Sequence, residues 1–166
     1  GQLAELFAVL VTAHYQTSPS DLILLLDNRQ IKLVSLNHGN QVIAVALLMI
    51  EGHCSSEELA AVKKSERRLR NQFLPQSLLT HCGIKNAFDY RYLRVMRIAV
   101  HPECQSLRLG SIFLKKIANF AAKLSLDFVG TSFGVNPSLL KFWLNADYHI
   151  ARLGFTRDKA SGEYSV

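Results

Sequence analysis

The stretch from Arg97 to Ser111 reads RIAVHPECQSLRLGS, and it decides the fold. Its first part, up to Val100, is apolar and β-branched like a buried strand, and a polar loop then leads directly into a helical periodicity that begins at Leu109. The first amides of a helix have no internal acceptor, and the helix dipole adds about half a positive charge there. A strand, a loop and a helix in this order therefore predict a site for an anion such as a pyrophosphate, with Gly110 free of a Cβ where a phosphate would come closest.

The hydrophobic periodicity on both sides of this stretch predicts a fold of mixed class. It indicates helices over about residues 2–15, 20–27, 55–71, 109–124 and 137–146, and strands at 31–36, 41–51, 92–100, 126–133, 148–155 and 162–166. The turn at 37–40 joins the first two strands in a hairpin, and the segment containing Pro75 and Gly83 is expected to be a loop. Helices between the later strands imply some parallel pairing, so the fold class is α/β (α+β), with helices packed on a mixed central sheet.

The helix predicted at 109–124 has two contrasting faces. Four apolar side chains are expected to point inward, and four polar ones outward. The inward set is Phe113, Ile117, Phe120 and Leu124, and the outward set is Lys115, Lys116, Asn119 and Lys123.

Composition restricts the class of protein. The 166 residues are 49% hydrophobic, which excludes a disordered chain, and no apolar run approaches the ~20 residues of a membrane span. Three scattered cysteines and the absence of a signal-like start favour a reducing, cytoplasmic location without a metal site or a membrane partner. The formal charge of +6 suggests an anionic partner such as RNA, a nucleotide cofactor or both.

The chain is expected to form one domain over residues 1–166. It opens with Gly1 instead of Met, and it stops inside the strand predicted at 162–166. We therefore expect it to be a domain excised from a longer protein.

Two motifs resemble those of a known family. Residues 98–102, with Gln105 and Gly110, resemble the acetyl-CoA motif Q/R-x-x-G-x-G/A of the GCN5-related N-acetyltransferases (GNAT). Residues 136–143, followed by Asp147 and Tyr148, resemble the N-x-x-A-x-x-L-Y-x-x-x-G-F helix of the same family. The two motifs occur in the family's order.

A narrower resemblance covers nearly the whole chain. The segments that carry it match the acetyltransferase region of the bacterial tRNA(Met) cytidine acetyltransferases, and they lie at residues 13–22, 74–78, 97–102, 132–134, 142–143 and 161–162. This resemblance implies a GNAT-type sheet, acetyl-CoA as cofactor, and acyltransferase activity on N4 of the wobble cytidine in elongator tRNA(Met). It also implies an ATPase or helicase-like module upstream in cis and an RNA-binding tail downstream. ATP or GTP and Mg²⁺ would bind only in that module, because no G-x-x-x-x-G-K-[ST] motif occurs here.

The resemblance assigns the cofactor contacts and exposes two departures. The implied acetyl-CoA contacts are Ile98, Ala99, Val100, Gln105, Ser106, Leu107, Arg108, Leu109, Gly110, Ser111, Ser138 and Asn145. Arg108 stands where the family motif has its first glycine, and Asp147 stands where the second motif has its glycine. Three outcomes are open for Arg108: its side chain points away while its amide binds, its guanidinium contacts phosphate, or cofactor binding is weakened.

The catalytic proton carrier is not fixed by the resemblance. The tyrosine that often protonates the leaving thiolate falls at Trp143, whose indole cannot do so. Tyr148, His101 and His149 are therefore the candidates, although His101 also suits a structural role in the turn at Pro102. Cys104 is expected to be a passive thiol, because direct transfer is usual in the superfamily.

A basic cluster provides the candidate RNA contacts. Its members are Lys63, Lys64, Arg67, Arg68 and Arg70 on the helix predicted at 55–71, with Arg91 and Arg94 on the strand before the cofactor loop. A solvated helix face and ordinary ion pairs are the alternatives. Phe142 and Trp143 suit base stacking or a core position. At the level of function, an acetyltransferase for a small-molecule or protein amine and a non-catalytic RNA-binding module remain open.

Overall fold

The computed structural model describes residues 2–13, 27–64, 69–157 and 162–166, and the helix predicted at 20–27 lies almost entirely outside them. The chain divides into two compact units. The first consists of Gly1–Met49 and Val95–Phe120, and the second of Ile50–Arg94 and Ala121–Val166.

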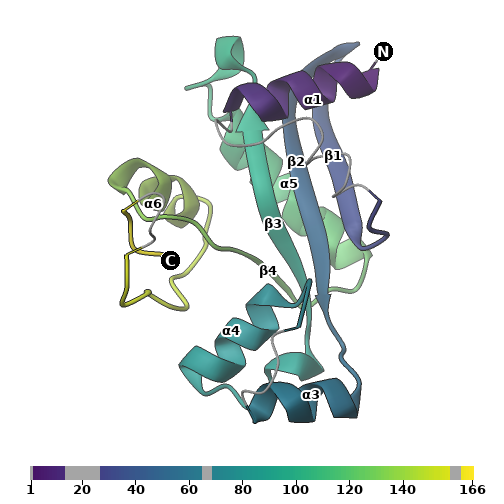
Figure 1. The fold of residues 1–166 in the computed structure, drawn as a ribbon. Coiled ribbons are helices and arrows are strands. Elements are labelled where there is room, and N and C mark those ends of the chain that lie inside the picture. The colour runs from purple at the N-terminus through teal and green to yellow at the C-terminus, as the bar shows by residue number, and fades with distance from the viewer. Residues whose placement is uncertain (1, 14–26, 65–68, 158–161) are drawn as a thin grey trace. The chain divides into compact units, whose positions relative to one another are not determined.

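A four-stranded sheet organises the described residues (Figure 1). Its strands are β1 (Ile31–His38), β2 (Gln41–Gly52), β3 (Arg91–Val100) and β4 (Phe128–Thr131), in the order β1-β2-β3-β4. The first two pair antiparallel, and His38 opposite Gln41 confirms the predicted hairpin. The predicted mixed α/β class is also confirmed, since helices flank this sheet.

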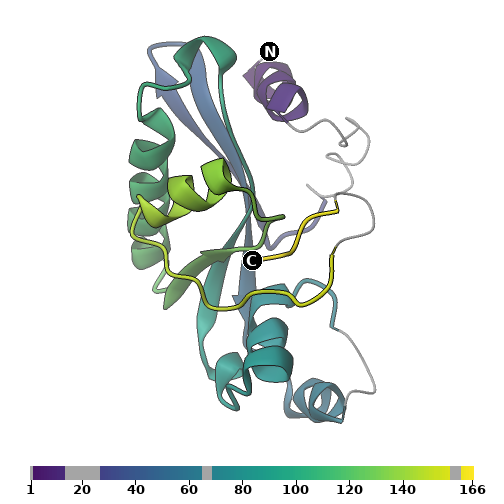
Figure 2. The same cartoon turned by 90° about the vertical axis from the view of Figure 1, so that its left-hand side faces the viewer.

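In the first unit, β2 is buried on both of its faces. Six successive side chains, Ala44 to Met49, are no more than 1% exposed, although neighbouring side chains of a strand point to opposite faces. Helix α1 (Gln2–Ala13) packs Val9 and Leu10 against one face, and α5 (Leu109–Lys123) covers the other (Figures 1 and 2). The predicted inward face of α5 is confirmed by buried Phe113 and Ile117, while Phe120 and Leu124 are half-buried.

The second unit corrects two predictions. The helix predicted at 55–71 is confirmed as α3 (Ser56–Lys63), but its predicted extent is wrong, because residues 64 and 69–71 are not helical. The loop predicted around Pro75 is also wrong, because α4 (Phe73–Cys82) runs through it. Pro75 lies in the first turn of α4, where a missing N–H costs no helical hydrogen bond. Gly83 ends the helix in the left-handed conformation that glycine adopts without strain.

The C-terminal strand predictions are corrected as well. The strand predicted at 148–155 is wrong, since those residues form no strand and only Gly154 donates its amide to Ser165 (2.7 Å). The segment 162–166 makes two isolated bridges, Gly134 with Ser165 and Arg157 with Tyr164. Single bridges do not make a ladder, so β-type composition was not sufficient here. The remaining elements of this unit are the short helix η1 (Ala87–Asp89) and α6 (Pro137–Leu144).

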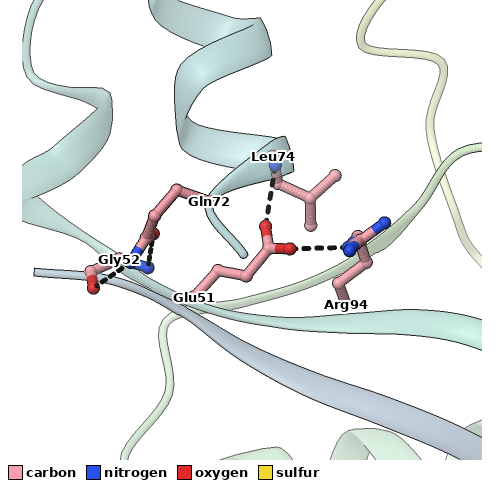
Figure 3. A network of polar contacts seen from close by, with 5 residues as sticks. All are labelled: Glu51, Gly52, Gln72, Leu74 and Arg94. Atoms are coloured by element: carbon pink, nitrogen blue, oxygen red, sulfur yellow. Dashed lines mark hydrogen bonds and ion pairs between the residues drawn. The ribbon is translucent and has the colours of Figure 1, made fainter. Parts of the chain in front are cut away.

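A buried ion pair attaches α4 to the sheet in the second unit (Figure 3). The Glu51 side chain at the end of β2 is fully buried, and its Oε1 accepts a hydrogen bond from Nε of Arg94 on β3 (2.6 Å). The other oxygen, Oε2, accepts from the amide of Leu74 (2.7 Å) in the first turn of α4. Arg94 also lies over the ring of Phe73, 5.2 Å from its centroid. Glu51 therefore supplies the cap that the N-cap residue of this helix does not supply.

The chain passes close to β3 immediately after Glu51. Gly52 has φ of 101°, and a Cβ at this position would lie 2.2 Å from the carbonyl oxygen of Tyr90. The side chain of Gln72 brackets the same residue, because its Oε1 accepts from the Gly52 amide (2.7 Å) and its Nε2 donates to the Gly52 carbonyl (3.3 Å). Only glycine fits this close approach to Tyr90, and the Gln72 side chain links Gly52 to the start of α4.

The buried carboxyl group leads to a prediction about pH. Burial raises the pKa of Glu51 above its ordinary value of 4.5, although Arg94 and the Leu74 amide act in the opposite direction. As pH rises from 4.5 through the native pKa, the unfolded chain releases this proton first, so the native state loses stability. In urea unfolding between pH 4 and 8, Glu51→Gln should therefore gain stability relative to the wild type as pH rises. A difference that stays constant with pH would contradict the direction of the shift.

Candidate functional site

The end of β3 and the turn after it are held by the first unit alone. The amide of His101 donates to the carbonyl of Ile43 on β2 (2.8 Å), so the pairing of the two strands continues one residue past Val100. Of the three strand residues assigned to the cofactor, Ala99 is buried, and Ile98 and Val100 are half-buried.

The His101 ring has a structural partner. Its Nδ1 accepts a hydrogen bond from the Glu103 amide (3.3 Å) at the start of the short helix η2 (Pro102–Cys104). Because Nδ1 acts as acceptor, the neutral ring carries its proton on Nε2. This geometry is the turn-shaping arrangement that the sequence offered as the alternative to catalysis.

Gln105 ties the loop back to the strand. Its Nε2 donates to the carbonyl of Val100 (3.3 Å), and its amide donates to Pro102 (3.4 Å). Gln105 thus has a local structural role: its side-chain amide closes the loop between β3 and α5.

A run of main-chain amides follows Gln105 and faces no protein acceptor. In the part of the chain that the structure describes, no group accepts a hydrogen bond from the N–H groups of residues 106–111. Two residues in this run have left-handed backbones, Ser106 (φ 65°) and Arg108 (φ 59°). Left-handed residues alternating with others turn successive N–H groups toward one point, which forms an anion-binding concavity. The positive end of the α5 dipole adds to the same field.

Both departures from the family motifs fall at left-handed residues. Arg108 has φ of 59° and Asp147 has φ of 64°. A non-glycine residue in this region costs about 1 to 2 kcal/mol, which explains why the family motifs have glycine at these positions. The main chain therefore keeps the glycine-type path at residue 108, while the Arg108 side chain is exposed.

An aromatic cluster surrounds Trp143 in the second unit. Its ring stacks on Phe133 (centroids 5.9 Å apart) and meets Phe142 and Tyr148 edge to face, at 5.4 and 4.8 Å. Trp143 is only 5% exposed, so this residue has the core position that the sequence gave as the alternative to base stacking. Asn136 begins α6 by accepting the Leu139 amide on its Oδ1 (2.9 Å), a cap that the motif reading did not identify.

The Tyr148 hydroxyl is buried in this cluster without a hydrogen-bond partner among the described residues. Burial raises its pKa to about 12, so the group keeps its proton throughout the neutral range. Of the other candidates in this region, His149, Ser138 and Asn145 are exposed. Tyr148 is thus the one of the three proposed proton carriers whose donor group is both desolvated and unpaired in the described structure.

The basic residues assigned to RNA are placed in three different ways. Lys64 and Arg70 are exposed, whereas the Lys63 side chain and residues 67–68 lie outside the described part. Arg91 is half-buried, and its amide donates to Asp127 (2.7 Å). Arg94 is the ion-pair partner of Glu51, so it has the ion-pair role that the sequence gave as the alternative, although the sequence did not identify a partner 43 residues away. Cys104 is half-buried.

Two classes of feature are absent from the described residues. None of their helices is both long enough and apolar enough to cross a bilayer. Within the same ranges, no three His, Cys, Asp or Glu side chains gather where they could hold a metal ion.

The fold has clear counterparts among solved structures. A crystal structure of an agmatine N-acetyltransferase mutant, S171A, in its apo form superposes with a TM-score of 0.65 at 14% identity, covering 98% of this chain and 90% of that chain. A Bacillus subtilis acetyltransferase in complex with CoA superposes with a TM-score of 0.57 at 16% identity, covering 91% and 73%. These superpositions show that the chain shares the fold of these two acetyltransferases.

The sequence comparisons identify the family. The family model described as GNAT acetyltransferase 2 matches residues 5–125 and 121–166, and the chain belongs to this family. It is similar to the tRNA(Met) cytidine acetyltransferase TmcA of Vibrio cholerae, with 39% identity over 165 residues. The match covers 99% of this chain but 23% of the relative, so the chain spans about a quarter of the relative's length.

The unpaired hydroxyl of Tyr148 generates a stability prediction. A buried hydroxyl without a partner costs about 1 to 3 kcal/mol, whereas removal of a hydrogen-bonded one destabilises. Tyr148→Phe should therefore leave the free energy of unfolding unchanged or raise it by about 1 kcal/mol in urea titrations. A loss of more than about 1 kcal/mol would show that the hydroxyl has a partner in the folded protein.

Proposed function

We propose that this chain binds acetyl-CoA at the turn after β3 and transfers the acetyl group to N4 of a cytidine in tRNA, the wobble cytidine of elongator tRNA(Met). The observation that carries the proposal is the run of amides at 106–111 that face no acceptor, in a chain of the GNAT acetyltransferase 2 family. The named relative supports the RNA substrate, since it is called a tRNA(Met) cytidine acetyltransferase and matches nearly the whole chain. Because the relative is much longer, an ATPase module and an RNA-binding tail in cis are part of the proposal.

The amides of the turn would hold the diphosphate of the cofactor. The loop before them is anchored by the Gln105 bond to Val100 and by the His101 bond to β2, so little conformational entropy would be lost when an anion binds. The solved acetyltransferase with CoA supports CoA as the ligand of this fold. The acetyl thioester supplies an activated acyl group, and the chain supplies its position.

The reaction depends more on the alignment of the N4 amine with the acetyl group than on a strong base. The N4 amine of cytosine is essentially unprotonated at neutral pH, although its lone pair is delocalised into the ring. Holding such an amine in line with an acyl group is worth about 7 to 11 kcal/mol. In this proposal the main chain at the end of β3 supplies the alignment, and Ile98 to Val100 are the residues that carry it.

Tyr148 is the proposed proton donor: it would protonate the CoA thiolate that leaves as N4 bonds to the acetyl carbon, while the proton that N4 loses would pass to solvent. Its hydroxyl is protonated at neutral pH, because burial raises its pKa to about 12. Among the described residues it makes no hydrogen bond. Trp143 packs against the ring edge to face and limits its rotation. His101 is assigned to the turn, since its Nδ1 is occupied by the Glu103 amide.

The function is tested on the complete natural polypeptide that contains this chain. With acetyl-CoA, ATP and elongator tRNA(Met), it should produce N4-acetylcytidine, detected by nucleoside mass spectrometry. In the same assay Tyr148→Phe should lower kcat by about a hundredfold, the scale of general acid catalysis. Failure to form N4-acetylcytidine, together with turnover of acetyl-CoA on small or peptide amines, would overturn the RNA assignment.

A pair of substitutions at Arg108 separates the amide from the guanidinium. Arg108→Gly keeps the N–H and the left-handed backbone, so acetyl-CoA affinity by calorimetry should change by less than about threefold. Arg108→Pro removes the N–H and fixes φ near −65°, so affinity should fall by about tenfold or more. An equal loss in both variants, with native circular dichroism, would instead assign the binding to the Arg108 side chain.

A further inference from the structure

Helix α5 carries an unusually one-sided charge. Its 15 residues, LGSIFLKKIANFAAK, include three lysines and no acidic residue. Lys115, Lys116 and Lys123 are all exposed, while the opposite side of the helix buries Phe113, Leu114 and Ile117. Helix α5 covers one face of the sheet (Figure 2), and its three lysines are on the exposed part of the helix.

The lysines follow one line along the helix. Ile112, Lys116, Asn119 and Lys123 recur at spacings of four, three and four, which is the spacing of a single helix face, and all four are exposed. Lys116 and Lys123 are two turns apart, or about 10.5 Å along the axis. Lys115 flanks this line. We call Lys115, Lys116 and Lys123 the α5 lysine face.

No counter-charge neutralises the α5 lysine face. Across the ranges that the structure describes, no carboxylate forms an ion pair with any of the three ammonium groups. The helix dipole favours Lys123, which lies in the last turn, but Lys115 and Lys116 lie mid-helix and gain nothing from it. Neither core packing nor an ion pair among the described residues accounts for the three lysines at these positions.

The helix that the sequence favoured for RNA has a different balance. Glu57 and Glu58 occupy the first turn of α3, and Glu58 accepts hydrogen bonds from the amide (3.1 Å) and hydroxyl (3.0 Å) of Ser55. The helix that leads into the basic cluster at 63–70 therefore carries both acidic and basic residues. By contrast, α5 carries three lysines and no acidic residue.

We propose that the α5 lysine face binds the phosphate backbone of the RNA substrate. The inference rests on the proposed function, since it names a surface that such a substrate would use. Lysines recognise phosphates as point charges, and an exposed amide such as Asn119 suits phosphate or sugar oxygens. Contacts of this kind position a nucleic acid without reading its sequence. They are separate from the turn at 106–111, where rigid amides face the ligand.

The test measures how charge variants of the complete polypeptide bind elongator tRNA(Met). Binding is measured by fluorescence anisotropy at several salt concentrations. The variant K115Q/K116Q/K123Q should bind the tRNA at least about tenfold more weakly at 0.1 M salt. The slope of log affinity against log salt should become shallower by about 2 to 3, at about 0.7 to 0.9 for each lost phosphate contact. Its affinity for acetyl-CoA should stay within about twofold of the wild type.

Two control variants make the test specific. K115R/K116R/K123R retains the charge and should bind the tRNA like the wild type. K32Q/K85Q/K141Q removes the same charge from exposed lysines elsewhere and should change the slope by less than half as much. All variants are compared by circular dichroism and thermal unfolding, so that a folding defect is recognised.

Each outcome has a definite meaning. An unchanged tRNA affinity and salt slope in K115Q/K116Q/K123Q would overturn the inference. If the tRNA affinity and salt slope are unchanged but the unfolding temperature of this variant falls, the inference of RNA binding is overturned. The lysines would then be assigned to a contact between α5 and another protein surface. Since binding is measured without turnover, a wild type that binds tRNA through this face but forms no N4-acetylcytidine would sink the proposed function and leave the inference standing.

Discussion

The burial of β2 on both faces is the constraint on which the first unit depends. Ala44 to Met49 form an uninterrupted apolar run, and a strand of this kind is stable only when both faces of its sheet are covered. Helix α1 covers one face and α5 the other, so α5 must start directly beyond the end of β3. The position of the turn at 101–108 is therefore a consequence of core packing, and the chemistry of the turn depends on that packing.

The turn itself shows that a motif specifies a backbone path more than a set of side chains. Arg108 and Asp147 replace glycines of the family motifs, yet both adopt the positive φ that explains a glycine there. At residue 108 the strain of about 1 to 2 kcal/mol is retained next to amides without acceptors. A left-handed backbone that keeps such a cost in a cofactor loop is the pattern expected when the N–H direction matters more than the residue type.

Local periodicity accounts for what the sequence predicted well. The hairpin of β1 and β2, the strand β3 and the helix α5 were all found, because each has a long and regular apolar pattern. Helix α4 was not predicted, because proline and glycine are typical of loops, whereas Pro75 lies in a first turn that tolerates proline and Gly83 lies just past the helix end. The strand at 148–155 was wrongly predicted, because strand composition does not provide a partner. The Glu51–Arg94 pair could not be found at all, since burial creates it between residues distant in the chain.

The two surfaces of α5 that we propose for phosphate would recognise it by different physics, and this difference would give them different tasks. At its start, the amides lie in a turn anchored by Gln105 and His101, so in this proposal they would favour one shape of anion. Along its middle, Lys115 and Lys116 are long and rotatable, so they tolerate many phosphate positions at the expense of specificity. A small cofactor with one structure suits a site of main-chain amides. A long RNA, whose phosphates must be able to shift while it is positioned, suits rotatable lysines. Because neither surface reads a base edge, the choice of one cytidine must depend on groups that contact the base itself, and these must be sought outside α5.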